Sequence, residues 1–178
     1  LLVTHTFDAD QAIRVALIAN TALHTCNLLL SYLLSKSLLS AFGVNETSLF
    51  VQRSLVVSAL LVGLHPLRVE VVAWASCLPY LLACLFSLLV LLTTIKDSHS
   101  DSVCSGWKLL GIVCYLLAAF SKVAASSVVA ASIVLEVTLR CRKQAQNTPM
   151  TPALVAKTIV TTALRSVPML AIGIYAVY

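Results

Sequence analysis

The sequence has few charged residues: 11% of its 178 residues are Asp, Glu, Lys or Arg, whereas 60% are hydrophobic and the mean hydropathy is +0.97. Soluble domains are about 25% charged and about 45–50% apolar. A soluble domain of this length has too little interior to bury so many Leu, Val and Ala side chains. The shortage of charge therefore excludes an ordinary soluble domain. It predicts an integral membrane protein, for which the lipid bilayer is the first partner.

Several kinds of functional site are also missing from the sequence. No block of Lys and Arg is interleaved with aromatic residues, which excludes a nucleic-acid surface and leaves no nucleic-acid partner. The six cysteines form no C-x-x-C pair and have no His at metal-ligand spacing, so the sequence predicts no metal site. A Gly-rich phosphate loop, a nucleophile elbow and an H-E-x-x-H motif are absent as well. Asp8 and Asp10 suit either a divalent cation or the positive end of a helix.

What the sequence has instead is a series of long apolar runs. A helical crossing needs about 20 residues, with a range of about 17–25, which the first and last runs reach alone. The middle runs reach it only with flanking residues or by packing within a bundle. Helices are favoured because the runs are rich in Leu and Ala, lack strict alternation and are too long for barrel strands. The sequence predicts an all-α membrane protein, a polytopic bundle of about six transmembrane helices within residues 1–178. The six runs are Ala12–Leu34, Leu49–Leu64, Tyr80–Ile95, Trp107–Phe120, Val123–Leu139 and Ala153–Tyr178.

The basic residues between the runs predict the orientation. Arg14, Arg68 and Lys122 lie on one side, and Arg165 lies within the last run. The connections after the odd-numbered runs contain 8 of the 12 basic residues, so the positive-inside rule places that side in the cytosol. Asn45-Glu46-Thr47 matches a glycosylation acceptor on this side, and a glycan there would invert the topology. The eight residues are Lys36, Arg53, Lys96, Lys108, Arg140, Arg142, Lys143 and Lys157.

A polar stripe runs along the first apolar run. Asn20, His24 and Asn27 are four and three residues apart, so they share one face of a helix. Polar side chains at membrane depth are costly and each needs a reason. Hydrogen bonds to neighbouring helices are one explanation. The other is a polar cavity, which keeps a transporter or channel segment as an alternative function.

The connection after the second run is the most informative polar stretch. Pro66 cannot continue a helix interior, so it marks a break and a fresh helix start. Arg68, Glu70 and Trp74 follow it, and the last two are four residues apart on one face. Trp side chains commonly anchor at the headgroup level of a membrane. Together with His65, these residues form either an interfacial helix or the wall of a substrate cavity.

Two further charged positions lie in the second half of the chain. Lys122, between the fourth and fifth runs, either extends its amine to the interface or binds an anionic headgroup or phosphate. Glu136 and Arg140 are four residues apart within and just after the fifth run. This spacing predicts an ion pair on the surface of one helix.

Three stretches resemble the membrane region of the transmembrane and tetratricopeptide-repeat O-mannosyltransferases, which belong to the GT-C class of lipid-linked sugar transferases. Their order and spacing fit the family, and the resemblance covers about Leu17 to Arg140. The stretches are Asn20-x-x-x-His24-x-x-Asn27, then His65-Pro66-x-x-Val69-Glu70-x-Val72-Ala73-Trp74-x-Ser76, then Leu116-Leu117-Ala118-x-x-Ser121-Lys122 with Glu136 fourteen residues further on.

The resemblance implies a multi-pass enzyme of the endoplasmic reticulum membrane. Its donor would be dolichyl-phosphate mannose, a polyprenyl-phosphate sugar, and its acceptor a Ser or Thr of a luminal protein. The chain begins at Leu1 without Met and ends inside an apolar run, so we expect a piece of a longer protein. The resemblance then implies catalytic acids upstream of Leu1 and tetratricopeptide repeats downstream of Tyr178.

Within the chain, the resemblance leaves His65, Arg68, Glu70 and Trp74 as candidates for the substrate cavity and Lys122 as the candidate for the lipid phosphate. The family has charged residues after the Trp-x-Ser stretch, whereas residues 77–80 here are Cys, Leu, Pro and Tyr. This departure keeps open a second alternative, a non-catalytic membrane scaffold derived from the same fold.

Overall fold

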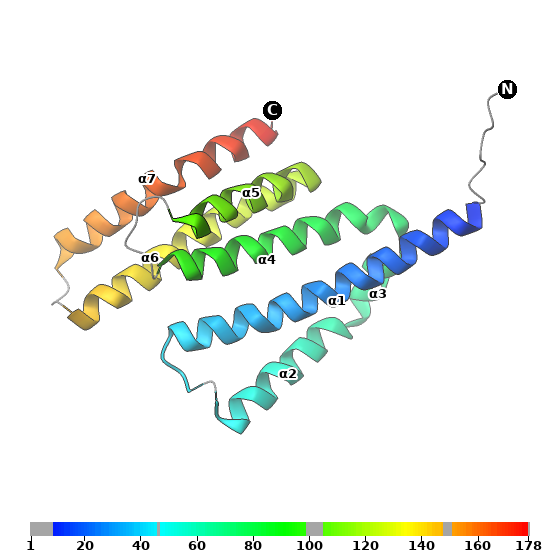
Figure 1. Ribbon diagram of the computed structural model, residues 1–178, viewed down its shortest axis with the longest axis horizontal. Helices are drawn as coiled ribbons and strands as arrows, with labels where there is room; N and C mark the ends of the chain where they lie inside the picture. Colours follow the sequence, from blue (N-terminus) through cyan, green and yellow to red (C-terminus); the bar gives the residue numbers. More distant parts are fainter. Residues whose placement is uncertain (1–8, 46, 99–104, 148–150, 178) are drawn as a thin grey trace.

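The computed structural model describes residues 9–45, 47–98, 105–147 and 151–177. The regular structure within these ranges is entirely helical, so the predicted fold class is confirmed at this level. Figure 1 shows the helices of 15 or more residues side by side and, in chain order, alternating in direction. Asp8, Glu46 and Cys104 lie outside the described residues, as does the side chain of Asp10. The elements are α1 (Ala9–Ala41), α2 (Leu49–Gly63), α3 (Pro66–Ala73), a 3-10 helix η1 (Ala75–Cys77), α4 (Leu78–Ser98), α5 (Gly106–Ser121), a 3-10 helix η2 (Val123–Ser127), α6 (Val128–Asn147) and α7 (Pro152–Val177).

Four segments in the described part of the chain are long and apolar enough to cross a membrane: Gln11–Ala41, Ala75–Ser98, Val123–Gln146 and Pro152–Tyr175. The chain is therefore a membrane protein. The third and fifth apolar runs were expected to be short. The third reaches this length because η1 precedes it and α4 continues to Ser98, and the fifth because α6 continues beyond Leu139. α2 and α5 are shorter apolar helices of 15 and 16 residues. They are about 22–24 Å long, against a hydrocarbon core of about 30 Å.

The helix ends form two groups. What we call the basic end contains the ends of α1, α4 and α6 and the starts of α2, α5 and α7. The far end contains the start of α1, the short helix α3 and the turn between α5 and η2 (Figure 1). Lys36 and Arg53, which the sequence assigned to a connection, lie inside α1 and α2. Lys36 is helical because α1 extends past the first apolar run: a helix needs its own backbone hydrogen bonds and not lipid around it. Arg53 lies within the second apolar run itself, Leu49–Leu64.

α1 ends in a Schellman motif at the basic end. Gly43 has φ +68°, and its N–H donates to the carbonyl of Ser40 at 2.8 Å. The N–H of Val44 donates to the carbonyl of Leu39 at 2.9 Å. These two bonds satisfy carbonyls that the last helical turn leaves without partners. The Arg142 guanidinium lies close above Gly43, which brings the ends of α1 and α6 together.

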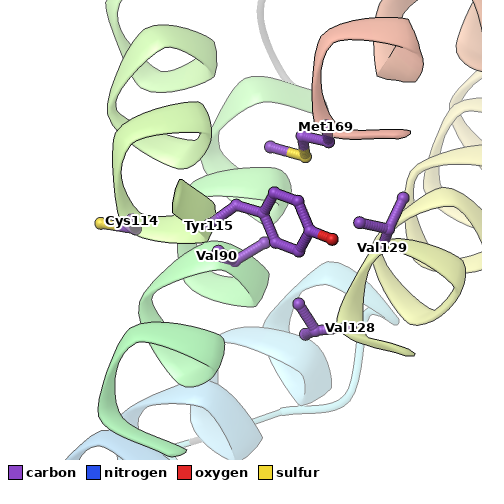
Figure 2. Packing of buried hydrophobic residues seen from close by; sticks show 6 residues of the cluster. All are labelled: Val90, Cys114, Tyr115, Val128, Val129 and Met169. Atoms are coloured by element: carbon purple, nitrogen blue, oxygen red, sulfur yellow. The ribbon is translucent and has the colours of Figure 1, made fainter. Parts of the chain in front are cut away.

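The largest hydrophobic cluster lies between α4, α5, α6 and α7. Its centre is Tyr115, whose side chain is completely buried. Gly173 permits this packing, because a Cβ at that position would lie 2.6 Å from the Tyr115 hydroxyl. α1 packs against α4 on the other side, and α2 packs against α1 at the edge of the bundle (Figure 1). Figure 2 shows the Tyr115 ring among Val90, Cys114, Val128, Val129 and Met169.

Candidate functional site

Asn20 of α1 holds the break between α3 and α4 in place. Its Nδ2 donates to the carbonyl of Trp74 at 2.9 Å and to the carbonyl of Val72 at 3.2 Å. Both carbonyls lie where α3 ends, and the Trp74 carbonyl also accepts from the N–H of Cys77 at 3.0 Å. Asn20 is completely buried. A side chain with two donors therefore satisfies two carbonyls at a place where water has little access.

The next two members of the stripe bind other helices in the same manner. His24 Nε2 donates to the carbonyl of Gly63, at the end of α2, over 3.2 Å. Asn27 Nδ2 donates to the carbonyl of Leu81, in α4, over 3.0 Å. The interpretation of the stripe as a source of interhelical hydrogen bonds is confirmed. The three side chains together fasten α2, α3 and α4 to one face of α1.

A pocket of about 570 Å³ opens beside this stripe at the far end of the bundle. Its volume lies within the range of about 300–1,000 Å³ that is common for small-molecule sites. His24 and Asn27 line it, so the stripe forms hydrogen bonds and borders a cavity at once. The other polar and aromatic lining residues are Ser31 of α1, Arg68 and Glu70 of α3, Trp74 and Ser76 at the break, and Tyr80 of α4.

Three of the four cavity candidates from the sequence meet in this pocket. Arg68, Glu70 and Trp74 all line the pocket, and all three residues are exposed. Pro66 begins α3, as its position predicted. This eight-residue helix contains Arg68 and Glu70, and Trp74 follows directly after it. His65 lies at the edge instead, where it lines a neighbouring cavity of about 550 Å³ that shares Arg68 with the pocket.

Lys122 is the candidate for the lipid phosphate, and it lies next to the pocket. Its ammonium is 4.2 Å from the centroid of the Tyr80 ring, and Tyr80 lines the pocket. Attraction between the cation and the ring face orients this long side chain. This contact of Tyr80 could not be predicted from the sequence, because it joins α4 to the turn after α5. A single Tyr at the start of an apolar run does not indicate which residue of another helix it will contact.

The pocket combines charged and apolar lining. Arg68 and Glu70 of α3 supply its charged lining, whereas Leu28 of α1 and Leu81 of α4 supply apolar lining. The lining residues of α1 run from His24 to Ser31, which corresponds to about 10 Å along the helix axis. Arg68 and Lys122 carry two positive charges against one on Glu70. The arrangement suits an amphiphile with an anionic head and an apolar tail.

A second polar cluster, which we call the charge network, joins α4, α5, α6 and α7 near the basic end. Glu136 pairs with Arg140 at 2.9 Å, with Lys108 at 3.2 Å and with Arg165 at 3.6 Å. Asp97 pairs with Arg165 at 3.0 Å and with Arg140 at 3.8 Å. Both acidic side chains are only 2% exposed. The predicted pair of Glu136 and Arg140 is confirmed, but it is one contact of a larger network.

Ser105 connects this network to the start of α5. Its hydroxyl donates to Asp97 Oδ1, and its oxygen accepts from the backbone N–H of Lys108 at 3.2 Å. Ser105 is thus the N-cap of α5 and a hydrogen-bond donor to the buried Asp97 carboxylate. Charges at membrane depth are tolerated when they are paired in this way. The network is suited to holding four helices in register.

In the described ranges, no group of three or more His, Cys, Asp or Glu side chains is placed to hold a metal ion. Comparisons with known proteins assign no family: no family model, curated protein or solved structure matches the chain. The resemblance to O-mannosyltransferases therefore depends on the sequence stretches alone.

Proposed function

We propose that this chain is the membrane part of a glycosyltransferase that transfers mannose from dolichyl-phosphate mannose to Ser or Thr of luminal proteins. One observation supports this most: the far-end pocket brings Arg68, Glu70 and Trp74 together, with Lys122 beside it. The resemblance of the His65–Ser76 stretch to the O-mannosyltransferases supports it independently. The proposal includes a GT-C-like fold in the endoplasmic reticulum membrane.

The donor has three chemical parts, and the pocket offers a match for each. Its phosphate is an anion, for which the Arg68 guanidinium supplies a planar pair of donors and Lys122 a second charge. Its sugar has hydroxyls that donate hydrogen bonds to the Glu70 carboxylate. The apolar faces of the sugar pack on Trp74. Its polyprenyl chain fits the apolar lining that Leu28 and Leu81 provide.

The proposed role of Glu70 is to position the sugar. Inverting transfer to a hydroxyl also needs a general base that removes the acceptor proton. The family resemblance puts that base on acidic residues upstream of Leu1, so no residue of this chain is assigned to it. The whole reaction therefore belongs to the parent protein, and this chain contributes donor binding.

We further propose that α2 and α5 cross the membrane, which gives six crossings. α1 and α2 lie antiparallel, as do α4 and α5 (Figure 1). If α2 or α5 did not cross, the chain would have to turn back to the side of the membrane from which that helix started, within a few residues. Local thinning of the bilayer and flanking residues accommodate short crossings at modest cost.

A non-catalytic scaffold is the second candidate function, and one observation favours it. Leu78 and Tyr80 stand at positions where the resembling family has charged residues, and Tyr80 lines the pocket. Without those charges, the pocket has fewer groups to hold a reacting phosphate. A transporter segment is less suited to the contacts, because Asn20, His24 and Asn27 use donor groups to bind backbone carbonyls.

Donor binding can be tested in nanodiscs with the whole chain. The sequence has two Trp residues, so Trp107→Phe leaves Trp74 as the only indole reporter. Titration with farnesyl phosphate should change its fluorescence. Arg68→Ala should weaken binding about 10-fold or more, because a hydrogen bond to a charged group contributes about 1.5–3 kcal/mol. Arg14→Ala is the matched control: it removes the same charge from the far end outside the pocket and should have no effect.

Catalysis is tested with the parent protein in microsomes. Glu70→Gln keeps the size of the side chain and removes the charge. If the parent is a transferase, this variant loses mannose transfer to a luminal acceptor while it still binds farnesyl phosphate. If transfer is absent in the unaltered parent although the donor binds, the scaffold is the correct function. If Arg68→Ala and Arg14→Ala bind farnesyl phosphate equally well, the pocket is not the donor site.

A further inference from the structure

Another cavity, of about 440 Å³, lies at the basic end between α6 and α7. Arg140, Lys157 and Arg165 line it, together with Leu154 and Leu164. Arg140 and Arg165 belong to the charge network, whereas Lys157 is exposed on α7. This cavity is at the opposite end of the bundle from the proposed donor pocket, so it requires its own explanation.

The cavity carries an excess of positive charge. The charge network has three cations, Lys108, Arg140 and Arg165, against the two carboxylates of Asp97 and Glu136. Lys157 adds a further positive charge at the mouth of the same cavity. A concave site of one charge sign with low-dielectric walls concentrates ions of the opposite sign. The preferred occupant is therefore an anion.

Arg140 has donor capacity that the network does not use. Its Nε bonds to Glu136 at 2.9 Å, but its buried Nη2 has no hydrogen-bond acceptor and lies 3.8 Å from Asp97 Oδ2. Buried donors are normally satisfied. A small rotation of the guanidinium toward the cavity would give Nη2 an anionic oxygen without breaking any hydrogen bond made by that nitrogen. Guanidinium groups suit phosphate oxygens in particular.

The walls of the cavity indicate that the anion is attached to an apolar chain. Leu164 lines the cavity and is 65% exposed, and Val160 on the same outer face of α7 is 57% exposed. α7 is one of the helices long enough to cross a membrane, so this face contacts lipid. The cavity thus joins a lipid-facing surface to a group of cations. A small soluble phosphate would make no use of the apolar side.

We propose that this cavity binds the headgroup of an anionic phospholipid from the cytosolic leaflet. Lys157 and Arg140 contact the phosphate, and an acyl chain lies along Leu164. The basic end faces the cytosol by the positive-inside rule, and the cytosolic leaflet is the anionic one. α6 and α7 are already joined there by the hydrogen bond from the Thr158 hydroxyl to Gln144 Oε1 at 2.8 Å. The bound phosphate bridges the same two helices.

The test uses the whole chain in neutral detergent micelles and fluorescently labelled phosphatidic acid, with anisotropy as the readout. Lys157→Ala should weaken binding about fivefold, the effect expected for one cation near a lipid phosphate. Thr161→Phe adds a ring at an exposed lining position and should weaken binding at least as much without changing the charge. Lys143→Ala is the matched control, because Lys143 is on α6 at the same end but lines a different cavity.

Phosphatidic acid should also bind at least tenfold more tightly than labelled phosphatidylcholine. Equal binding of the two lipids would overturn the proposal. Equal losses for Lys157→Ala and Lys143→Ala would overturn it too, because they would indicate general charge attraction. Displacement of the lipid by glycerol 3-phosphate at similar concentrations would replace the lipid with a soluble organic phosphate as the occupant. Farnesyl phosphate binding at the far end is unaffected by these variants, which separates the two sites.

Discussion

Neutralising Glu136 should destabilise the bundle more than any other single loss of charge. Glu136 is the acid with the most partners in the charge network, with cationic nitrogens at 2.9, 3.2 and 3.6 Å. Each contact represents roughly 5 kcal/mol of attraction at an effective dielectric constant of about 20, much of it offset by desolvation. Glu136→Gln keeps the shape but leaves three buried cations with Asp97 alone. Removing one partner of a buried pair costs about 3–5 kcal/mol.

The assay is thermal unfolding in detergent, followed by a dye that reacts with thiols as buried Cys114 becomes exposed. A loss of about 3–5 kcal/mol corresponds to a Tm lower by about 6–20 °C in a chain of this size. Asp97→Asn should cost less than Glu136→Gln, because Asp97 has two cationic partners. Glu70→Gln is the matched control: Glu70 is exposed on α3, and the same change there should leave Tm unaltered.

A double variant distinguishes a pairing effect from a general effect of the substitution. Lys108→Met removes the least shared cation of the network, so combined with Glu136→Gln it lowers the excess of positive charge. The two changes together should cost less than the sum of the two alone, by about 0.5–3 kcal/mol. Additive costs, or a Glu136→Gln variant that melts like the unaltered chain, would refute the buried network.

Two further predictions concern topology and packing. Asn45 should carry no glycan when the chain is made with microsomes, whereas an acceptor tag fused ahead of Leu1 should be glycosylated; the reverse pattern would invert the orientation. Gly173→Ala places a Cβ 2.6 Å from the Tyr115 hydroxyl and should cost about 1–3 kcal/mol in thermal unfolding, whereas Gly106→Ala meets open space and should be neutral. Equal Tm values for these two variants would contradict the packing of α5 against α7.

Much of the fold could be predicted from sequence, because its main determinants are local. Apolar runs mark helices, Pro66 marks a break, and residues four apart such as Glu136 and Arg140 meet on one helix whatever surrounds it. The helix ends could not be read in the same way. α1 continues to Ala41 and α6 to Asn147, because backbone hydrogen bonds can continue a helix after it leaves the lipid.

The candidate site could be predicted only where its residues are close in sequence. Arg68, Glu70 and Trp74 lie within seven residues of one another, so a single short helix and its end bring them to one pocket. The contacts of Tyr80 with Lys122 and of Asp97 with Arg165 depend on which helices are neighbours. Hydropathy says nothing about that choice.

The central claim is that the far-end pocket binds a polyprenyl phosphate, and photo-crosslinking tests it most directly. A short polyprenyl phosphate with a photoreactive group near the phosphate is bound to the chain in nanodiscs, and the labelled peptides are identified by mass spectrometry. The proposal predicts labelling of α3 and the start of α4, between Pro66 and Cys84, with much less labelling in Arg68→Ala than in Arg14→Ala. Labelling confined to α6 and α7, or the same labelling in both variants, would contradict it.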